Sequence, residues 1–597
     1  MNRLFAIFVT KFAELPFLGR QDSKSTPAQY TEDDDLSLAL YYVRSLSSVL
    51  RWAPEAAWAV LAKRFVRSDA YHPPLSGISK PPPTRTSRSQ NLTNQAGTDG
   101  DVSLQEFFLR VCLQCMAHDK VPGEEGPEAR ATQLHRAALN VLHQTLLNPF
   151  AEQLAKLHLE NILVGKLQQS LSGPDPYVQV LLLDVVYAAL KLRELVPAEP
   201  PTSPANHEKR LGQLEAARSS RASLVEKHMV MQPPPPTLLK CILAGLSSPS
   251  SRPVLDSWIG FLTECLPLYT DSVFQVLIPL VETLCRQIGN TFNSLQRLFR
   301  VADQTPSHGA AGPETTLISL LNGLEQVLAR GHDRLLAEEA RVQVVKSPDQ
   351  PQGFFGNMVS GVFSSDAPQT RSATANDRLT VLLAFQDAVR MCFTIWSWGQ
   401  GRDAAGQDAT SGASLNYTSL RMRNRARRLL EHLFAAETLE CLETVIGIWR
   451  GALDSADVSK AAEVFNLLPA LDGSRPKHTI PALFNAIYSR TNPSVLDPSR
   501  RSTLTIELQD TDLVIFLVDY TRSLEDDTMD EIWQDCTAFL RDILGNPFPH
   551  RQTLPSLLEF AAILGEKVDN TNFGEQRKMR RDLAVGLQYL LTGCSAC

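Results

Sequence analysis

The hydrophobic pattern along the chain is helical almost from end to end. In residues 134–147, apolar side chains recur at the spacing i, i+3, i+4, i+7 that places them on one helix face. Alternation with period two is nearly absent, and residues 341–346 (RVQVVK) are one weak strand candidate. This pattern predicts an all-α protein. The other helical segments are residues 36–50, 53–66, 254–266, 317–328, 379–396, 426–448, 513–517 and onward, and 554–564.

Polar and proline-rich stretches interrupt the helical pattern, and they predict loops or disorder. They are longer than the usual connection of about four to six residues, which fits insertions looped out from one face of a helical array. The sequence therefore predicts an α-solenoid of HEAT/armadillo-like helical pairs with long disordered insertions. The interrupting stretches are residues 72–101, 197–204, 233–236, 305–314, 346–375, 399–414 and 491–501.

The predicted organisation divides the chain at these stretches. We expect N-terminal helices in residues 1–70, a disordered linker in 71–102, a helical-repeat block in 103–300, a helix plus a disordered insertion in 301–376, a helix in 377–400, a loop in 401–416 and a C-terminal helical-repeat block in 417–592.

The tripeptide Asn-Pro-Phe occurs after two of the apolar helical runs, at residues 148–150 and 546–548. Proline disfavours the α conformation of the residue before it, so each asparagine is expected to end its helix. The proline then suits the first turn of the next helix. Phe150 and Phe548 are expected to pin these corners against the preceding helix.

Composition narrows the classes of function. The 597 residues carry a net charge of -7, which argues against a dedicated nucleic-acid binder. Most of the 10 cysteines are scattered singly, as is typical of reduced, buried thiols in the cytosol. The most apolar runs, residues 178–190 and 274–281, are shorter than the roughly 20 residues of a spanning helix, so no membrane span is expected. Residues 1–18 predict an amphipathic helix rather than a signal peptide.

One acidic motif resembles a metal-binding site. Asp526, Asp527 and Asp530 form a D-D-x-x-D pattern, which in helical isoprenoid synthases holds Mg²⁺ ions on a diphosphate. Such enzymes need a second metal motif on a facing helix, and the sequence shows none. The alternative interpretation, a helix start capped by Ser523 with acids in its first turn, is favoured.

Two pairs of cysteines have other interpretations. Cys112 and Cys115 suggest zinc, with His118 nearby, but a structural zinc site needs four ligands, and packing as small hydrophobic side chains is favoured. Cys594 and Cys597 occupy the place of a prenylation motif whose middle residues are not aliphatic. No catalytic residue, cofactor, metal or small-molecule substrate is therefore expected, and the chain is predicted not to be an enzyme.

Basic and apolar clusters are candidates for contact with a membrane or a partner. An arginine row is expected to open a helix. It either binds anionic lipid or a partner protein, or is a solvated helix face paired with acids such as Glu431. A second basic run lies near the end of the chain. Phe354, Phe355 and Phe363 lie on one face of a short predicted amphipathic helix, which docks on its own scaffold, a partner or a membrane. The arginine row is Arg421, Arg423, Arg425, Arg427 and Arg428, and the second run is Arg577, Lys578, Arg580 and Arg581.

Several long stretches resemble the Dopey family, especially its filamentous-fungal members. They include SWIGFLTECLPLYTDSVFQVLIPLVETLC at residues 257–285, DPYVQVLLLDVV at 175–186, GFFGNMVSGVF at 353–363 and the stretches at 370–399 and 554–583. The resemblance runs from about residue 6 to residue 583, and the chain resembles an interior or truncated portion of a family member. The tail after Asp582 departs from the family pattern.

The resemblance implies a function that the residues themselves do not show. Dopey proteins are large cytosolic helical-repeat proteins that act peripherally on Golgi and endosome membranes in recycling traffic, and in fungi they are linked to cell morphogenesis. The resemblance therefore implies a non-enzymatic scaffold or adaptor in vesicle-mediated protein transport, with a Sec7-related scaffold and a phospholipid flippase as partners. The alternatives are the Mg²⁺-dependent isoprenoid synthase and a lipid or motor adaptor that uses the arginine row.

Overall fold

The computed structural model describes most of the chain as two compact units, Met1–Asp271 and Ser272–Cys597, each of which is presented by itself. In the described part nearly every residue belongs to a helix or a short connection, which confirms the all-α prediction. The described residues are 2–19, 30–31, 34–66, 102–117, 129–173, 175–195, 233–300, 312–345, 367–398, 409–471, 474–497, 500–570, 577–581 and 584.

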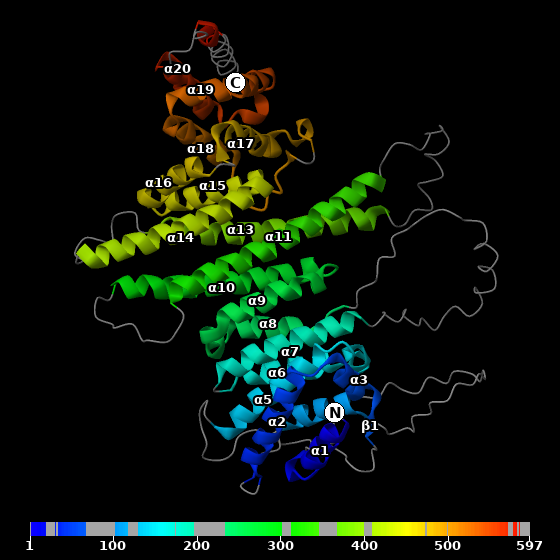
Figure 1. Cartoon of the computed structure of the whole chain (residues 1–597). Coiled ribbons are helices and arrows are strands. Elements are labelled where there is room, and N and C mark those ends of the chain that lie inside the picture. Colours follow the sequence, from blue (N-terminus) through cyan, green and yellow to red (C-terminus); the bar gives the residue numbers. More distant parts are fainter. Residues whose placement is uncertain are drawn as a thin grey trace, which may run out of the picture. The chain divides into compact units, whose positions relative to one another are not determined.

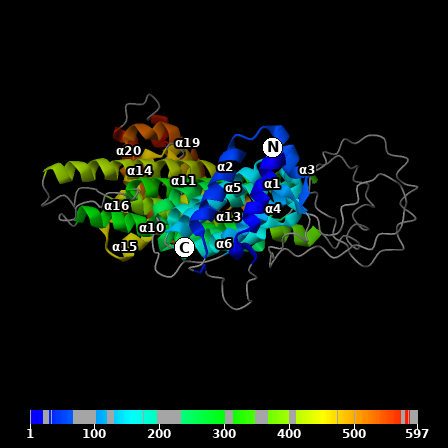
Figure 2. The same cartoon turned by 60° about the horizontal axis from the view of Figure 1, so that its bottom comes forward.

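The first unit stacks its helices in chain order (Figure 1), and Figure 2 shows α2 and α5, which contact each other, side by side. Helix α5 contacts α2, α4 and α7, α6 contacts α7 and α8, and α9 contacts α7 and α8. Short 3-10 helices form several of the corners: η1 (Pro16–Gly19), η3 (Ala151–Leu157), η5 (Pro249–Val254) and η6 (Leu266–Tyr269). The α-helices are α1 (Asn2–Ala13), α2 (Leu36–Arg51), α3 (Glu55–Lys63), α4 (Leu104–Cys115), α5 (Arg130–Leu146), α6 (Leu159–Ser170), α7 (Pro176–Glu194), α8 (Pro236–Ser247) and α9 (Leu255–Cys265).

Local sequence explains where helices of this unit begin. Asp35 caps α2 by accepting from the N–H of Leu38 at 2.9 Å, and Asp175 accepts from the N–H of Tyr177 at 3.0 Å just before Pro176 opens α7. The predicted amphipathic helix at the N-terminus is α1, whose aromatic face is buried with Phe5 and Phe12 against Phe108 of α4.

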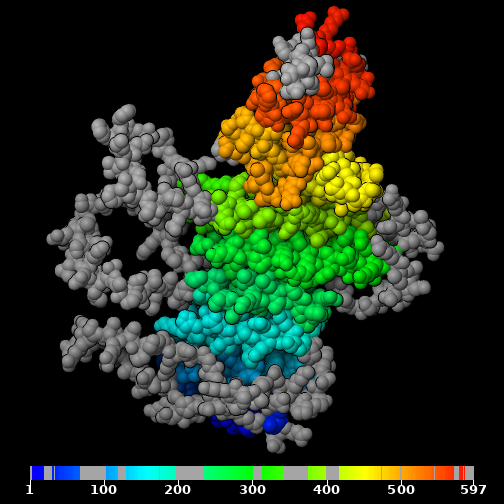
Figure 3. Space-filling view, turned by 180° about the vertical axis from the view of Figure 1, so that it is seen from behind, coloured from blue at the N-terminus to red at the C-terminus, as the bar shows by residue number. Residues whose placement is uncertain are grey.

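The second unit continues the same design. Helix α13 contacts α10, α11, α14 and α15, α15 contacts α16 and α17, α17 contacts α18 and α19, and α18 contacts α20. Figure 3 shows these helices as successive bands in sequence order. Since each helix packs on near neighbours in the chain, the arrangement is an α-solenoid, as predicted. The α-helices are α10 (Val273–Arg300), α11 (Pro313–Val345), α13 (Ala367–Trp396), α14 (Ala409–Ala436), α15 (Thr438–Asp454), α16 (Val458–Leu467), α17 (Pro476–Thr491), α18 (Asp510–Ser523), α19 (Met529–Gly545) and α20 (Leu554–Asn570), and the 3-10 helices are η7 (Leu468–Ala470), η9 (Pro493–Val495), η11 (Asp526–Thr528) and η12 (Phe548–His550).

Several predicted boundaries were wrong. Helices α13 and α14 begin at Ala367 and Ala409, inside stretches predicted as loops, because their first turns are polar and lack an apolar stripe. Residues 341–345 end helix α11 and are not a strand. A small antiparallel sheet was not predicted: β1 (Phe65–Val66) pairs with β2 (Val102–Ser103) beside α3 and α4.

Both Asn-Pro-Phe segments are corners between helices, as predicted. Asn148 follows α5, its side chain bonds the carbonyl of Thr145 and accepts from the N–H of Phe150, and a 3-10 helix comes next. Asn546 is the C-cap of α19 and again precedes a 3-10 helix. The expected role of phenylalanine was wrong at the second corner, because Phe548 is 78% exposed there, whereas Phe150 is half-buried.

One described helix is long and apolar enough to cross a membrane, which the sequence analysis overlooked. It is the Thr374–Trp396 part of α13, and 61% of its apolar window is buried. Because α13 packs on four other helices of the unit, burial in the solenoid core accounts for its apolar side chains.

Candidate functional site: a polar clamp and an arginine row

The connection between α17 and α18 folds inward, onto α15. The sequence analysis predicted residues 491–501 as a loop looped outward. Those of them that the structure describes, 491–497 and 500–501, are mostly exposed, and it is the residues that follow them that pack inward. Leu508 is buried, and Ile506 lies against the backbone of α15 at Gly447, where an added Cβ would be 3.3 Å from its Cγ2. The connection is therefore part of the packed unit.

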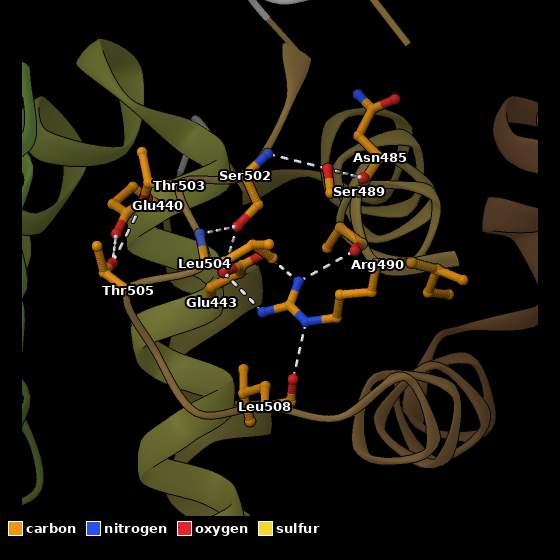
Figure 4. Close-up of polar contacts among 12 residues, drawn as sticks. Glu440, Glu443, Asn485, Ser489, Arg490, Ser502, Thr503, Leu504, Thr505 and Leu508 are labelled. Carbon is orange, nitrogen blue, oxygen red and sulfur yellow. Dashed lines mark hydrogen bonds and ion pairs between the residues drawn. The ribbon is translucent and has the colours of Figure 1, made fainter. Parts of the chain in front are cut away.

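A buried ion pair holds this connection in place (Figure 4). Arg490 of α17 donates to both carboxylate oxygens of Glu443 on α15, at 2.8 and 3.2 Å, and its Nε donates to the carbonyl of Leu508 at 2.8 Å. The side chains of Glu443 and Arg490 are 1% and 10% exposed. A bidentate pair at this depth satisfies charges that would be costly to bury alone.

Hydroxyl groups of the connection complete the arrangement. Ser502 donates to Glu443 at 2.8 Å, and Thr503 and Thr505 donate to the two oxygens of Glu440 at 2.9 and 2.8 Å. The amide of Gln386 on α13 donates to Glu440 and to Thr505. We call this set the loop clamp: Gln386, Glu440, Glu443, Arg490, Ser502, Thr503 and Thr505.

Leu504 forms the tip of the connection that the loop clamp holds, and this tip is exposed and strained. Leu504 has a φ of 56°, the left-handed region that non-glycine residues rarely adopt, and it is 53% exposed. Its N–H donates to the hydroxyl of Ser502 at 3.1 Å. The clamp hydrogen bonds on both sides of Leu504 fix this conformation.

Sequence reasoning missed the loop clamp, although one signal was present. Glu440 and Glu443 stand three residues apart within the apolar segment of residues 426–448, so both acids fall on a buried helix face. A buried acid requires a partner, and that requirement points to a long-range ion pair or hydrogen bond.

The arginine row lies in the middle of α14 and does not open a helix, contrary to the prediction. Arg421 pairs with Glu314 of α11 at 2.7 Å, and Arg425 pairs with Glu325 of α11. These two arginines therefore tie α14 to α11.

The other members of the row differ in their contacts. Arg427 pairs with Glu431 at 2.7 Å, which is the solvated-face arrangement that the sequence analysis named, and it donates to the carbonyl of Ala470. Arg423 stacks over the ring of Trp396, with its guanidinium carbon 4.6 Å from the ring centroid, and Arg428 is exposed. Contact of the row with a membrane or partner stays a prediction.

The remaining candidate contacts are partly outside the described residues. Phe354, Phe355 and Phe363 lie there, so the structure says nothing of them. In the second basic run, Arg580 pairs with Asp569 at 2.7 Å, while Arg577 is exposed.

The acidic motif does not form a metal site. The ammonium of Lys567 on α20 lies 3.1 Å from a carboxylate oxygen of Asp526 and also donates to the carbonyl of Leu524. Asp526 is therefore already paired with a lysine of the same chain. Asp527 and Asp530 are exposed. Within the part of the chain described, no group of three metal-ligating side chains occurs. The isoprenoid-synthase alternative is not favoured.

The prediction that Ser523 caps the helix of the acidic motif was also wrong. Ser523 is the last residue of α18, and its hydroxyl donates to the carbonyl of Tyr520 at 2.7 Å. The 3-10 helix η11 separates it from α19, because the chain turns between two helices here instead of starting one directly.

The described cysteines are buried and free, as predicted. Burial raises the pKa of Cys115 to about 12 and raises the pKa of Cys112 well above its usual value. Zinc binds the thiolate, so this environment opposes a site at these two residues. His118, Cys594 and Cys597 lie outside the described residues.

Comparisons with known proteins place the chain among the DOP1 proteins. A family model described as the DOP1 TPR domain matches residues 143–329, and one described as DOP1 C-terminal matches residues 516–596. The second match includes the tail after Asp582, which the sequence analysis had wrongly set apart from the family.

Two curated relatives cover different shares of the chain. Protein dop1 of Emericella nidulans is 50% identical over 99% of this chain and 31% of that protein. Protein DOP1 of Saccharomyces cerevisiae is 28% identical over 58% of this chain and 20% of that protein. The chain thus spans less than a third of the length of either relative. A solved circular tandem repeat protein is 12% identical over 83% of the chain with a TM-score of 0.28, too low to assign a fold.

From the two family models and the relative that is half identical along almost the whole chain, we conclude that the chain belongs to the Dopey family.

Proposed function

We propose that this region is a non-enzymatic scaffold in vesicle-mediated protein traffic between Golgi and endosomes. It acts on the cytoplasmic side, peripherally on these membranes, through protein contacts. A Sec7-related scaffold and a phospholipid flippase are the partners that the family resemblance implies. Membership in the Dopey family supports a Dopey-type role, and the partners and the site of action are part of the proposal.

The observation that carries the scaffold proposal is the stacking of helices in both units, which leaves large apolar side chains at corners exposed. Trp52, the C-cap of α2, is 82% exposed, Phe548 in η12 is 78% exposed, and Val458 at the start of α16 is 76% exposed. Single exposed apolar residues are common on protein surfaces, but tryptophan in particular is enriched among residues that dominate binding energy. Solenoids use such extended surfaces for binding.

Affinity purification of the tagged protein, expressed from its own locus and followed by mass spectrometry, tests the proposal. We expect recovery of a Sec7-related scaffold and a phospholipid flippase, and fractionation of the tagged protein with Golgi and endosome membranes. A protein that stays wholly cytosolic and recovers neither class would contradict the proposal.

A pair of variants at one corner tests whether the exposed side chains carry contacts. Trp52→Ser removes the indole without removing a core contact, so the fold is retained and partner recovery should fall several-fold. Arg51→Ser, at the neighbouring exposed position, is the matched control and should leave recovery unchanged. Equal recovery in both variants would exclude this corner as a contact.

A further inference from the structure

The tip of the loop clamp combines two arginines with an exposed hydroxyl. Arg500 and Arg501 precede Thr503 by three and two residues, and all three are exposed. Protein kinases select substrates by charge patterns of this kind, in which acids of the kinase pair with arginines just before the acceptor hydroxyl. Ser502 stands one residue nearer the arginines and is half-buried, so Thr503 is the better placed acceptor.

We propose that Thr503 is a phosphorylation site for an arginine-directed protein kinase, and that its phosphate releases residues 500–509 from α15. The proposal is independent of the trafficking role. In the reaction, Thr503 Oγ1 attacks the γ-phosphorus of ATP and a new O–P bond forms. The bond from that phosphorus to the bridging oxygen breaks, ADP leaves with this oxygen, and the hydroxyl proton passes to the catalytic aspartate of the kinase.

The geometry explains why phosphorylated Thr503 cannot take the position that it has in the loop clamp. Thr503 Oγ1 lies 2.9 Å from a carboxylate oxygen of Glu440, a residue that is only 4% exposed. In place of a donated hydrogen bond, the modified side chain would bring almost two negative charges against this buried carboxylate. Repulsion is strong where water is scarce, so the clamped state is disfavoured.

The released state keeps the remaining charges of the clamp satisfied. Glu443 retains its bidentate pair with Arg490, and Glu440 retains the amide of Gln386. Release therefore leaves α15 and α17 joined. It frees the segment that carries Leu504 and the buried Leu508, whose carbonyl then no longer accepts from Arg490.

The full chain, treated with the catalytic subunit of an arginine-directed kinase and ATP, tests the site. Peptide mass spectrometry should locate phosphate on Thr503. The phosphorylated fraction should be at least tenfold smaller in Arg500→Ala/Arg501→Ala, and Thr503→Ala should carry no phosphate at this residue. In Ser502→Ala, modification of Thr503 should persist. Modification of Ser502 in place of Thr503, or no modification of this peptide, would overturn the assignment.

Hydrogen exchange tests the consequence. In the phosphorylated chain, amides of residues 504–509 should exchange at least tenfold faster, while those of α8 remain unchanged. Thr503→Val loses the same hydrogen bond without adding charge, so its increase should be several-fold smaller than that of Thr503→Glu. Glu440→Gln removes the repelling charge and should reduce the effect of phosphate. Unchanged exchange in the phosphorylated chain, or equal effects of Val and Glu, would refute release by charge.

Discussion

A single methyl group added at Gly245 is expected to disrupt the packing of α8 on α9. Gly245 is buried and faces Trp258, and an added Cβ would lie 2.3 Å from two atoms of the indole and 2.4 Å from a third. Trp258 is fully buried, and its Nε1 donates to Gln179 of α7 at 3.0 Å. A rigid ring fixed at both sides cannot move aside without losing that bond.

The magnitude follows from three contributions. Overpacking a well-packed core costs about 1–3 kcal/mol. If the indole shifts, the buried Oε1 of Gln179 loses its hydrogen-bond donor, at about 1–3 kcal/mol. Alanine gains up to about 1 kcal/mol over glycine in a helix. The central values of these ranges sum to a loss of about 3 kcal/mol, so Gly245→Ala should lower local stability by about 2–4 kcal/mol.

Gly260 is the matched control on α9. It is exposed, and nothing lies within 4 Å of an added Cβ. Gly260→Ala should gain about 0.5–1 kcal/mol, because only the helix propensity changes.

Hydrogen exchange measured by mass spectrometry is the appropriate assay, because it reports local opening in a chain with two units. The expected loss in Gly245→Ala corresponds to roughly 30- to 700-fold faster exchange in α8 and α9, at a factor of ten per 1.4 kcal/mol. Peptides of α18 serve as the internal reference. Exchange in Gly245→Ala as slow as in Gly260→Ala would refute the packing argument.

Three further predictions concern buried polar groups. Arg490→Met strands the buried carboxylate of Glu443 and should cost about 3–5 kcal/mol, while Arg490→Met/Glu443→Leu should recover most of it, as read from exchange in α17. Burial lowers the pKa of His550, so the stability that its neutral form contributes is complete above about pH 6.5 and is lost as the pH falls toward the lowered pKa. The thermal unfolding temperature should fall over this pH range, and His550→Asn should make the fall smaller. Because burial raises the pKa of Cys112 and Cys115, iodoacetamide should leave both unmodified in the native chain and alkylate both in guanidinium chloride, as peptide masses will show.

The parts of the fold that could be predicted are those in which local sequence determines structure. Helix α5 has a regular apolar stripe, and its end at Asn148 follows from the steric effect of proline on the preceding residue. The starts of α13 and α14 were missed, because their first turns (APQT and ATSG) are polar and carry no periodic signal.

The loop clamp could not be predicted in the same way, because its partners are distant in sequence. Thr503 and Glu440 are 63 residues apart, and Gln386 and Thr505 are 119 apart. The sequence indicates only that Glu440 and Glu443 need partners, and many hydroxyl groups and arginines are available. Similarly, Phe548 has the sequence context of Phe150 but a different exposure, since the surrounding helices and not the tripeptide decide what covers it.

The loop clamp changes how the second unit transmits structural change. In a solenoid each helix contacts mainly its neighbours, so the stability of a block depends on successive interfaces. The clamp adds a polar contact from Gln386 on α13, through Glu440 on α15, to the segment that follows α17. Release of this segment by a phosphate on Thr503 would remove its contacts with α15, while Gln386 still joins α13 to α15 and Arg490 still joins α17 to α15. A small modification at the exposed tip therefore acts on one connecting segment and leaves the two successive helix interfaces in place.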